Sequence, residues 1–198
     1  SNTTANDNTG IGYYTLSSNT TGLQNVGVGA SALAATTTSS NNTALGWHAM
    51  LVANGAVDSV AVGSEALASV TTGDYNVGVG FQALKTITTS GNCVAVGYQA
   101  LENNTAGNNT ALGSNALTAC TTGQGNTSVG KASLQANTTG ATNVAVGFNA
   151  MEQNTTGSNN TAIVYEAGKS NPVAAKNTIC RYFTNLVISF KQISILAC

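Results

Sequence analysis

Few side chains in this sequence are of the types that perform chemistry, and their spacing does not group them. His48 is the only histidine, and no carboxylate stands at metal-ligand spacing from it. The four cysteines, Cys93, Cys120, Cys180 and Cys198, form no C-x-x-C pair. The sequence therefore predicts no cofactor, no metal site and no enzymatic activity, and we expect the cysteines to fill small spaces.

Two further kinds of site are also not expected. Gly-x-Gly pairs such as Gly27–Gly29 resemble phosphate loops, but no helical pattern follows them, as such loops require. Six basic and seven acidic residues give a net charge of −1, which provides no attraction for nucleic acid or an anionic membrane surface. No run approaches the roughly 20 apolar residues of a membrane-spanning helix. We therefore expect no nucleic-acid partner and no membrane insertion.

The sequence is organised by a motif, N-[VT]-[AG]-[VIL]-G-x-x-A-[LM], that recurs every 17 residues. One interval, from Cys93 to Asn109, has 16 residues. A fixed period of this size is typical of stacked repeat proteins. We therefore predict an all-β parallel β-solenoid (β-roll) of about ten coils over residues 1–168. Residues 169–198 do not follow the motif, and we interpret them as a C-terminal cap or a strand that links subunits.

We call the first residue of the motif, usually Asn, the anchor and number it 0. Each later position of the motif then predicts a place in the coil. Positions +1 and +3 are β-branched or apolar and share one face of a short strand, whereas +2 and +4 are small and share the other. A thin coil cannot cover both faces, so we expect other chains to bury one of them. Thr pairs such as Thr20-Thr21 predict a second short strand, and Gly22 the turn after it.

Two columns of identical residues follow from stacking the coils. Position +8 predicts the core, and its members are Leu16, Leu33, Met50, Leu67, Leu84, Leu101, Leu117, Leu134 and Met151. The anchors predict a hydrogen-bonded ladder at one corner, because identical amides bond from coil to coil. Its members are Asn8, Asn25, Asn42, Asn76, Asn109, Asn126, Asn143 and Asn160, with Ser59 and Cys93 in the remaining anchor positions.

Position +5 is the candidate site for binding a partner, because it is often aromatic. A line of rings is suited to stacking on sugar rings or to a protein surface. It is also suited to shielding the corner of the coil or a seam between subunits, and we favour this interpretation because aromatic residues serve at interfaces for their area alone. The two roles do not exclude each other. The members of this aromatic column are Tyr13, Trp47, Phe81, Tyr98, Phe148 and Tyr165.

The repeats also resemble those of known protein families. Asn143-Val-Ala-Val-Gly-Phe-Asn-Ala-Met151 and Asn109-Thr-Ala-Leu-Gly-Ser-Asn-Ala-Leu117 are similar to the head repeats of trimeric autotransporter adhesins. They are still more similar to the N-T-A-V-G-x-x-A-L repeats of phage and giant-virus tail-fibre-type proteins. The resemblance implies a left-handed parallel β-roll, three chains around one axis, and attachment outside the cell.

Three functions are consistent with these features. The first is an extracellular structural fibre or adhesin segment on a cell or virion surface, built as a rigid multi-chain rod for attachment or projection. The second is a self-assembling extracellular filament stacked end to end. The start of the sequence within a repeat and the atypical C-terminal segment fit either of these two. The third is an ice-binding solenoid, although the Gly after most Thr pairs prevents a flat T-x-T array. The expected partners are copies of the chain, as a trimer or an end-to-end polymer, and a cell-surface glycan or protein receptor.

Overall fold

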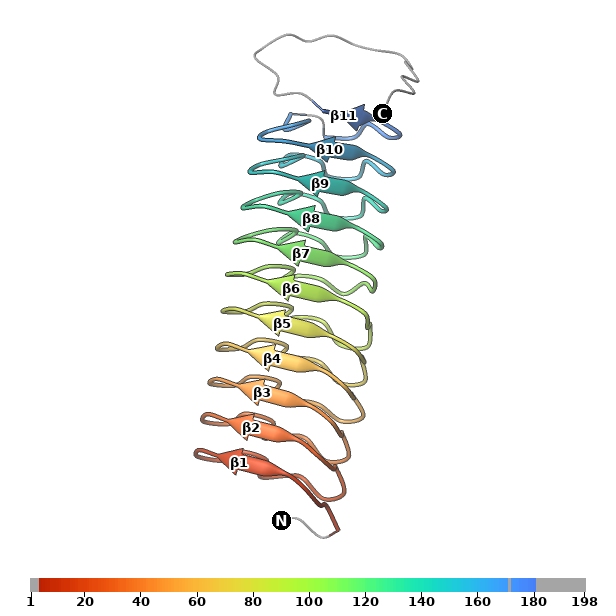
Figure 1. The fold of residues 1–198 in the computed structure, drawn as a ribbon. Helices are drawn as coiled ribbons and strands as arrows, with labels where there is room; N and C mark the ends of the chain where they lie inside the picture. The colour runs from red at the N-terminus through yellow and green to blue at the C-terminus, as the bar shows by residue number, and fades with distance from the viewer. Residues whose placement is uncertain (1–3, 171, 181–198) are drawn as a thin grey trace.

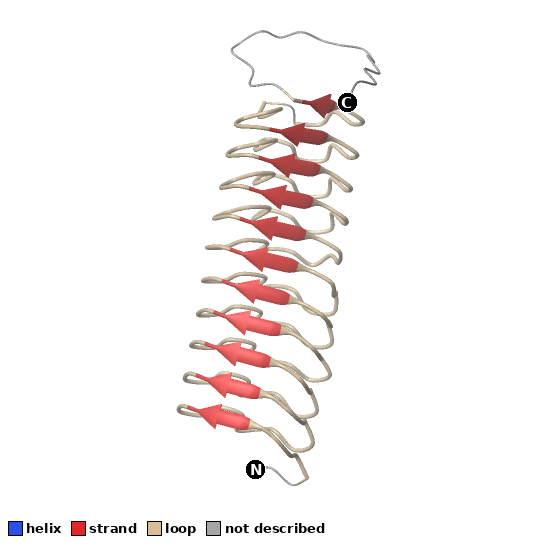
Figure 2. Cartoon of the chain, viewed as in Figure 1, coloured by secondary structure: helices blue, strands red, loops and turns tan. Residues whose placement is uncertain are grey.

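The chain forms a single stack of coils, seen in a computed structural model that describes residues 4–170 and 172–180 (Figure 1). Each coil contributes one short strand to one parallel sheet, whose 11 strands follow chain order. Figure 2 shows these strands in a single row, with turns and loops completing every coil. The predicted all-β parallel solenoid of about ten coils is confirmed. The strands are β1 (Thr9–Ile11), β2 (Val26–Val28), β3 (Thr43–Leu45), β4 (Val60–Val62), β5 (Val77–Val79), β6 (Val94–Val96), β7 (Thr110–Leu112), β8 (Thr127–Val129), β9 (Val144–Val146), β10 (Thr161–Ile163) and β11 (Thr178–Ile179).

The register of the sheet keeps each motif position next to its own copies. Val26 of β2 pairs with Thr43 of β3, one period later. The 16-residue interval does not shift this register, because Val94 of β6 still pairs with Thr110 of β7. The missing residue is absorbed in a loop, where Thr105 stands alone in place of a Thr pair. The connecting loop can therefore change in length while the register between the strands stays the same.

The core lies on the side of the strand that carries the small residues. In β6 only the middle residue, Ala95, is fully buried, whereas Val94 is half-buried and Val96 is exposed. Position +2 therefore faces inward, and the bulkier +1 and +3 side chains face outward from a single chain. At +8, seven side chains are fully buried, Met151 is nearly so and Leu16 is half-buried; the seven are Leu33, Met50, Leu67, Leu84, Leu101, Leu117 and Leu134.

A further inward column, at +11, was not predicted from the sequence. Its asparagines find partners inside the coil: Asn154 Nδ2 donates to Asn137 Oδ1 at 2.9 Å and to the Gly157 carbonyl oxygen at 3.0 Å. The buried hydroxyl of Thr36, by contrast, has no hydrogen-bond partner among the described residues. Internal partners are the condition for burying an amide, so this column can hold Asn in some coils and apolar residues in others. The fully or nearly fully buried members are Asn19, Thr36, Ala53, Val70, Ile87, Asn104, Cys120, Asn137 and Asn154.

The anchor residues connect successive coils through their side chains. Asn8 Oδ1 accepts the backbone N–H of Asn25 at 2.8 Å, and Asn25 Nδ2 donates to the Ser39 carbonyl oxygen at 2.8 Å. The pattern repeats up to Asn177, whose N–H donates to Asn160 Oδ1 at 3.0 Å. From Asn25 to Asn160 all of these anchors are buried, and Asn8 is half-buried. Each anchor thus pairs backbone groups that would otherwise be buried without a partner.

The Thr pairs do not form the second strand that the sequence predicts, and this expectation is wrong. The N–H groups of Thr20 and Thr21 both donate to the carbonyl oxygen of Thr37, at 3.0 and 3.2 Å. Because both donors use one acceptor, the chain bends instead of continuing a ladder. The Thr20 hydroxyl also donates to the Thr37 carbonyl oxygen, at 3.1 Å, so the pair still joins neighbouring coils.

Three non-glycine positions in most coils adopt left-handed backbone conformation, namely −1, +6 and +8. In the third coil these are Asn41, His48 and Met50, with φ of 61°, 53° and 47°. Position +4 has a stricter requirement: Gly46 has φ of 138°, and a Cβ there would lie 2.6 Å from the carbonyl oxygen of the next coil's glycine. Val164 occupies this position in the tenth coil, at φ of 112°.

The sheet continues beyond residue 168, the predicted end of the repeat domain. Strand β11 pairs with β10 in the same register as the earlier strands. Gly168 replaces the usual Leu at +8, and a Cβ there would lie 2.9 Å from Ile179 Cδ1. The Ile179 side chain, at +2, therefore occupies space that a Leu fills elsewhere. The suggested cap or linking strand at 169–198 falls largely on residues 181–198, outside the described residues.

Candidate functional site

At three positions, +5, +6 and +9, the residue type varies from coil to coil, because the fold of the coil does not require a particular side chain there. All three lie in the turn that follows the strand, after the glycine at +4 has ended it. We call the side chains at these positions the outer ridge. Apart from Asp and Lys residues near the anchors, the described charged residues lie here: Glu65, Lys85, Glu102, Lys131, Glu152, Glu166 and Lys169.

The aromatic column of the outer ridge is divided into separate groups. Phe81 and Tyr98, on consecutive coils, stack with ring centroids 5.5 Å apart and planes 14° apart. Phe148 and Tyr165 stack in the same way, at 5.3 Å and 9°. All six predicted rings are exposed, from 38% for Phe148 to 73% for Tyr13. The structure thus brings four of the six together, as two ring pairs.

The two remaining rings have neighbours of other kinds. Tyr13 makes an edge contact with Tyr14, at a centroid distance of 4.4 Å. Trp47 stacks on His48, with centroids 3.6 Å apart. His48 is thus a neighbour of an aromatic ring, and it belongs to no cluster of metal-ligating side chains among the described residues.

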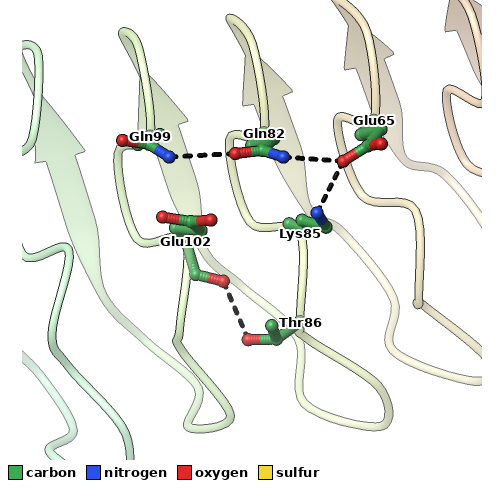
Figure 3. Close-up of polar contacts among 6 residues, drawn as sticks. All are labelled: Glu65, Gln82, Lys85, Thr86, Gln99 and Glu102. Carbon is green, nitrogen blue, oxygen red and sulfur yellow. Dashed lines mark hydrogen bonds and ion pairs between the residues drawn. The ribbon is translucent and has the colours of Figure 1, made fainter.

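A polar network lies beside the first ring pair, at positions +6 and +9 of three successive coils (Figure 3). Gln99 Nε2 donates to Gln82 Oε1 at 2.9 Å, and Gln82 Nε2 donates to Glu65 Oε2 at 2.7 Å. Lys85 Nζ lies 2.6 Å from the same carboxylate oxygen. The network was not predicted from the sequence, although residues 17 apart with matching donors and acceptors were the available signal.

A related network lies beside the second ring pair. Asn149 Nδ2 donates to Glu166 Oε1 at 3.5 Å, at the limit for a hydrogen bond. Lys169 Nζ lies 2.8 Å from Glu166 Oε1 and 3.4 Å from Glu152 Oε2. Both ring pairs are therefore flanked by an amide and a lysine that meet at one carboxylate.

The electrostatics of these networks favour the charged forms. The hydrogen bond from Lys85, then that from Gln82, holds the pKa of Glu65 below its usual value. The pKa of Glu166 is lowered mainly by Lys169, and the pKa of Lys169 is raised mainly by Glu166. A general acid needs a carboxyl group with a raised pKa. Because the pKa values of Glu65 and Glu166 are lowered, these carboxylates are suited to accepting hydrogen bonds.

The described cysteines are free thiols, and the two within the repeats are buried. Burial raises the pKa of Cys93, and it raises the pKa of Cys120 to about 11. Cys93 Sγ lies 3.3 Å from the Ala106 carbonyl oxygen, and Cys120 Sγ lies 3.4 Å from that of Gly123. A nucleophilic thiol needs a lowered pKa and access to a substrate, and these two have neither.

A second exposed surface is the outward side of the sheet, formed by positions +1 and +3 of every strand. We call it the sheet face. Its side chains are Val, Thr, Leu and Ile, and several at +3 are more than one third exposed. Those members are Ile11, Leu45, Val96, Leu112 and Ile163.

Comparisons with known proteins add no family to this description. A scan against protein-family models, a search of curated proteins and a search of solved structures each gave no match to the chain. Within residues 4–170 and 172–180 there is no helix with the length and apolar character needed to cross a membrane.

Proposed function

We propose that this chain is a segment of an extracellular structural fibre or adhesin, in which several copies lie side by side as a rigid rod for attachment or surface projection. The sheet face is the observation that carries the proposal. Its 11 strands, about 4.8 Å apart, form a strip about 48 Å long with no charged side chain, in which +3 of β1 to β10 is always Val, Leu or Ile and +1 is Val or Thr. Monomeric proteins rarely expose a continuous apolar column of the length that the +3 side chains form here.

A second copy of the chain is the partner that fits this strip best. Copies share one 17-residue period, so their +1 and +3 side chains can interdigitate along the full length of the rod. Closed rotational symmetry buries the same strip on every copy and leaves none exposed. The resemblance to adhesin heads and tail-fibre-type repeats supports three copies around one axis and a location on a cell or virion surface.

The test is the native mass of the protein, measured by sedimentation at several concentrations. We expect a discrete oligomer, and Val79→Arg, on the sheet face, should convert it to single chains with an unchanged circular dichroism spectrum. Gln153→Arg adds the same charge at an exposed position off the sheet face and should leave the mass unchanged. If Val79→Arg prevents folding, Val62→Thr combined with Val79→Thr weakens the same surface without adding charge.

Three results of these measurements would count against the proposal. A wild-type protein that sediments as single chains at all concentrations would refute it, as would a Val79→Arg protein with unchanged mass. An open-ended polymer would favour the end-to-end filament instead. Ice binding gains little support, because Thr20, Thr71, Thr121 and Thr138 direct their hydroxyl groups to carbonyl oxygens of the next coil.

A further inference from the structure

We propose that the outer ridge binds a neutral polysaccharide along the rod, through the two ring pairs Phe81/Tyr98 and Phe148/Tyr165. This inference deepens the proposed attachment function and rests on it, because it names the chemical class of the partner. The surface in question is separate from the sheet face, which we assign to contacts between copies.

The first argument is that the same set of side chains, an amide, a Glu and a Lys, accompanies both ring pairs at positions that folding leaves free. The Glu lies on the coil before the first pair, but on the second coil of the second pair. At +5, +6 and +9 the repeat specifies no residue type, yet both ring pairs lie beside an amide that donates to a Glu. In each case a Lys at +9 pairs with that same Glu, as Lys85 does with Glu65 and Lys169 with Glu166. Coil stability alone does not require this combination, since other coils have Ala or Ser at these positions.

The second argument is the match to carbohydrate chemistry. A pyranose ring presents an apolar C–H face, which packs on an aromatic ring, and a rim of hydroxyl groups that need both donors and acceptors. The Phe81 and Tyr98 rings are exposed. The Gln82 and Gln99 amides, which directly follow these rings in sequence, and the Glu65 carboxylate supply donors and acceptors (Figure 3). Aromatic surface with a few fixed polar groups is typical of small-molecule recognition.

Charge favours a neutral polymer over an anionic one. At the first ring pair, Lys85 is paired with Glu65 at 2.6 Å. Glu102 lies on the next coil (Figure 3), and it takes part in none of the salt bridges among the described residues. At the second, Lys169 is shared by Glu166 and Glu152. Lys131, 5.9 Å from the Phe148 ring centroid, balances the remaining acidic charge there. Neither place has the excess of positive charge that a sulfated or uronic acid polymer needs.

The spacing favours a long chain over a single sugar. Phe81 and Phe148 lie four coils apart, which corresponds to about 19 Å along the rod. A polysaccharide laid along the outer ridge can contact both ring pairs at once. Two linked contacts raise the apparent affinity well above that of either alone.

The experiment measures retardation of the native full chain in gels that contain one soluble polysaccharide each: hydroxyethyl cellulose, a mannan, a xylan, a galactan or alginate. We expect at least one neutral polymer to retard the protein, with little effect of salt, and alginate to have none. Phe81→Ala with Tyr98→Ala should weaken that binding about tenfold. Removing both ring pairs should abolish it, and a disaccharide of the same sugar should compete poorly.

Tyr75→Ala is the matched control, because Tyr75 is an equally exposed ring at position −1, off the outer ridge. It should bind as the wild type does. The proposal is overturned if no neutral polymer retards the wild type, if binding survives the loss of all four rings, or if only alginate binds. Sedimentation of each variant separates this result from the proposed assembly. Ring variants that fall to single chains would place the rings at a subunit seam and overturn the inference.

Discussion

The ladder of anchor side chains predicts a graded loss of stability when Asn76 is replaced, first by Ser and then by Ala. Asn76 is fully buried in the middle of the rod. Its Oδ1 accepts the N–H of Cys93 at 3.1 Å, and its Nδ2 donates to the Ser90 carbonyl oxygen at 3.0 Å. Alanine would leave both backbone groups without these partners.

The size of the effect follows from the two lost hydrogen bonds. Each buried group that loses its partner costs about 1–3 kcal/mol. Because Ser90 is partly exposed, we expect about 2–4 kcal/mol in total for Asn76→Ala. Ser59 shows what serine does in this column: its Oγ accepts the N–H of Asn76 at 3.1 Å but donates to the Val57 carbonyl oxygen. Asn76→Ser should therefore keep the acceptor, lose the donor, and cost about half as much.

Urea unfolding, followed by circular dichroism at one fixed protein concentration, measures these free energies. The control is Asn103→Ala, since Asn103 also donates to a carbonyl oxygen, that of Thr118 at 2.9 Å, but on the surface. It should cost less than about 0.5 kcal/mol. The reasoning is wrong if Asn76→Ala costs no more than Asn103→Ala, or if Asn76→Ser is as harmful as Asn76→Ala.

Three further predictions concern the core, the backbone and the dependence on pH. Leu84→Asp should abolish folding in thermal melts, because it buries a charge at +8, whereas Asn115→Asp, at +6, should leave the melting temperature within a few degrees. Val164→Gly should raise stability in urea by about 1 kcal/mol, because glycine accepts φ of 112° without strain; a loss would show that the Val side chain matters more. Burial raises the pKa of Cys120 to about 11, so its stabilising effect is full below pH 9 and is lost as the pH rises toward 11. Cys120→Ala should remove part of that alkaline loss in unfolding measured at pH 8 and pH 10, and an unchanged loss would contradict this assignment.

The fold was predictable because the stacking of coils forces one residue type into each column. Buried Leu and Met at +8 and the anchor ladder follow directly from the 17-residue period. Strand β11 was missed because two departures from the motif compensate each other. Gly168 removes the side chain at +8, and Ile179 supplies a larger one at +2 than the motif allows. A pattern read one position at a time cannot detect such an exchange of volume between neighbouring coils.

The outer ridge was predictable only in part. The aromatic residues at +5 were visible, but their division into two ring pairs depends on Ser64, Ser114 and Lys131, which interrupt the column. The networks around Glu65 and Glu166 join residues far apart in sequence, and whether they meet depends on side-chain reach as well as register. The Thr pairs were assigned to a strand because Thr favours strands. That preference says nothing about the carbonyl oxygen that accepts from both N–H groups of a pair, such as that of Thr37, and so bends the chain.

The left-handed positions show where the stability of this rod must lie. Positions −1, +6 and +8 are left-handed in most coils, and each such non-glycine residue costs roughly 1 kcal/mol. A single coil therefore starts with an unfavourable free energy of about 3 kcal/mol before its loss of conformational entropy is counted. The favourable contributions, namely the strand pairing, the anchor ladder and the packing at +8, all act between neighbouring coils. It follows that a coil draws its stability from its neighbours, so central substitutions such as Asn76→Ala, which weaken contacts within the stack, should affect the whole rod more than the same change near either end of the described stack.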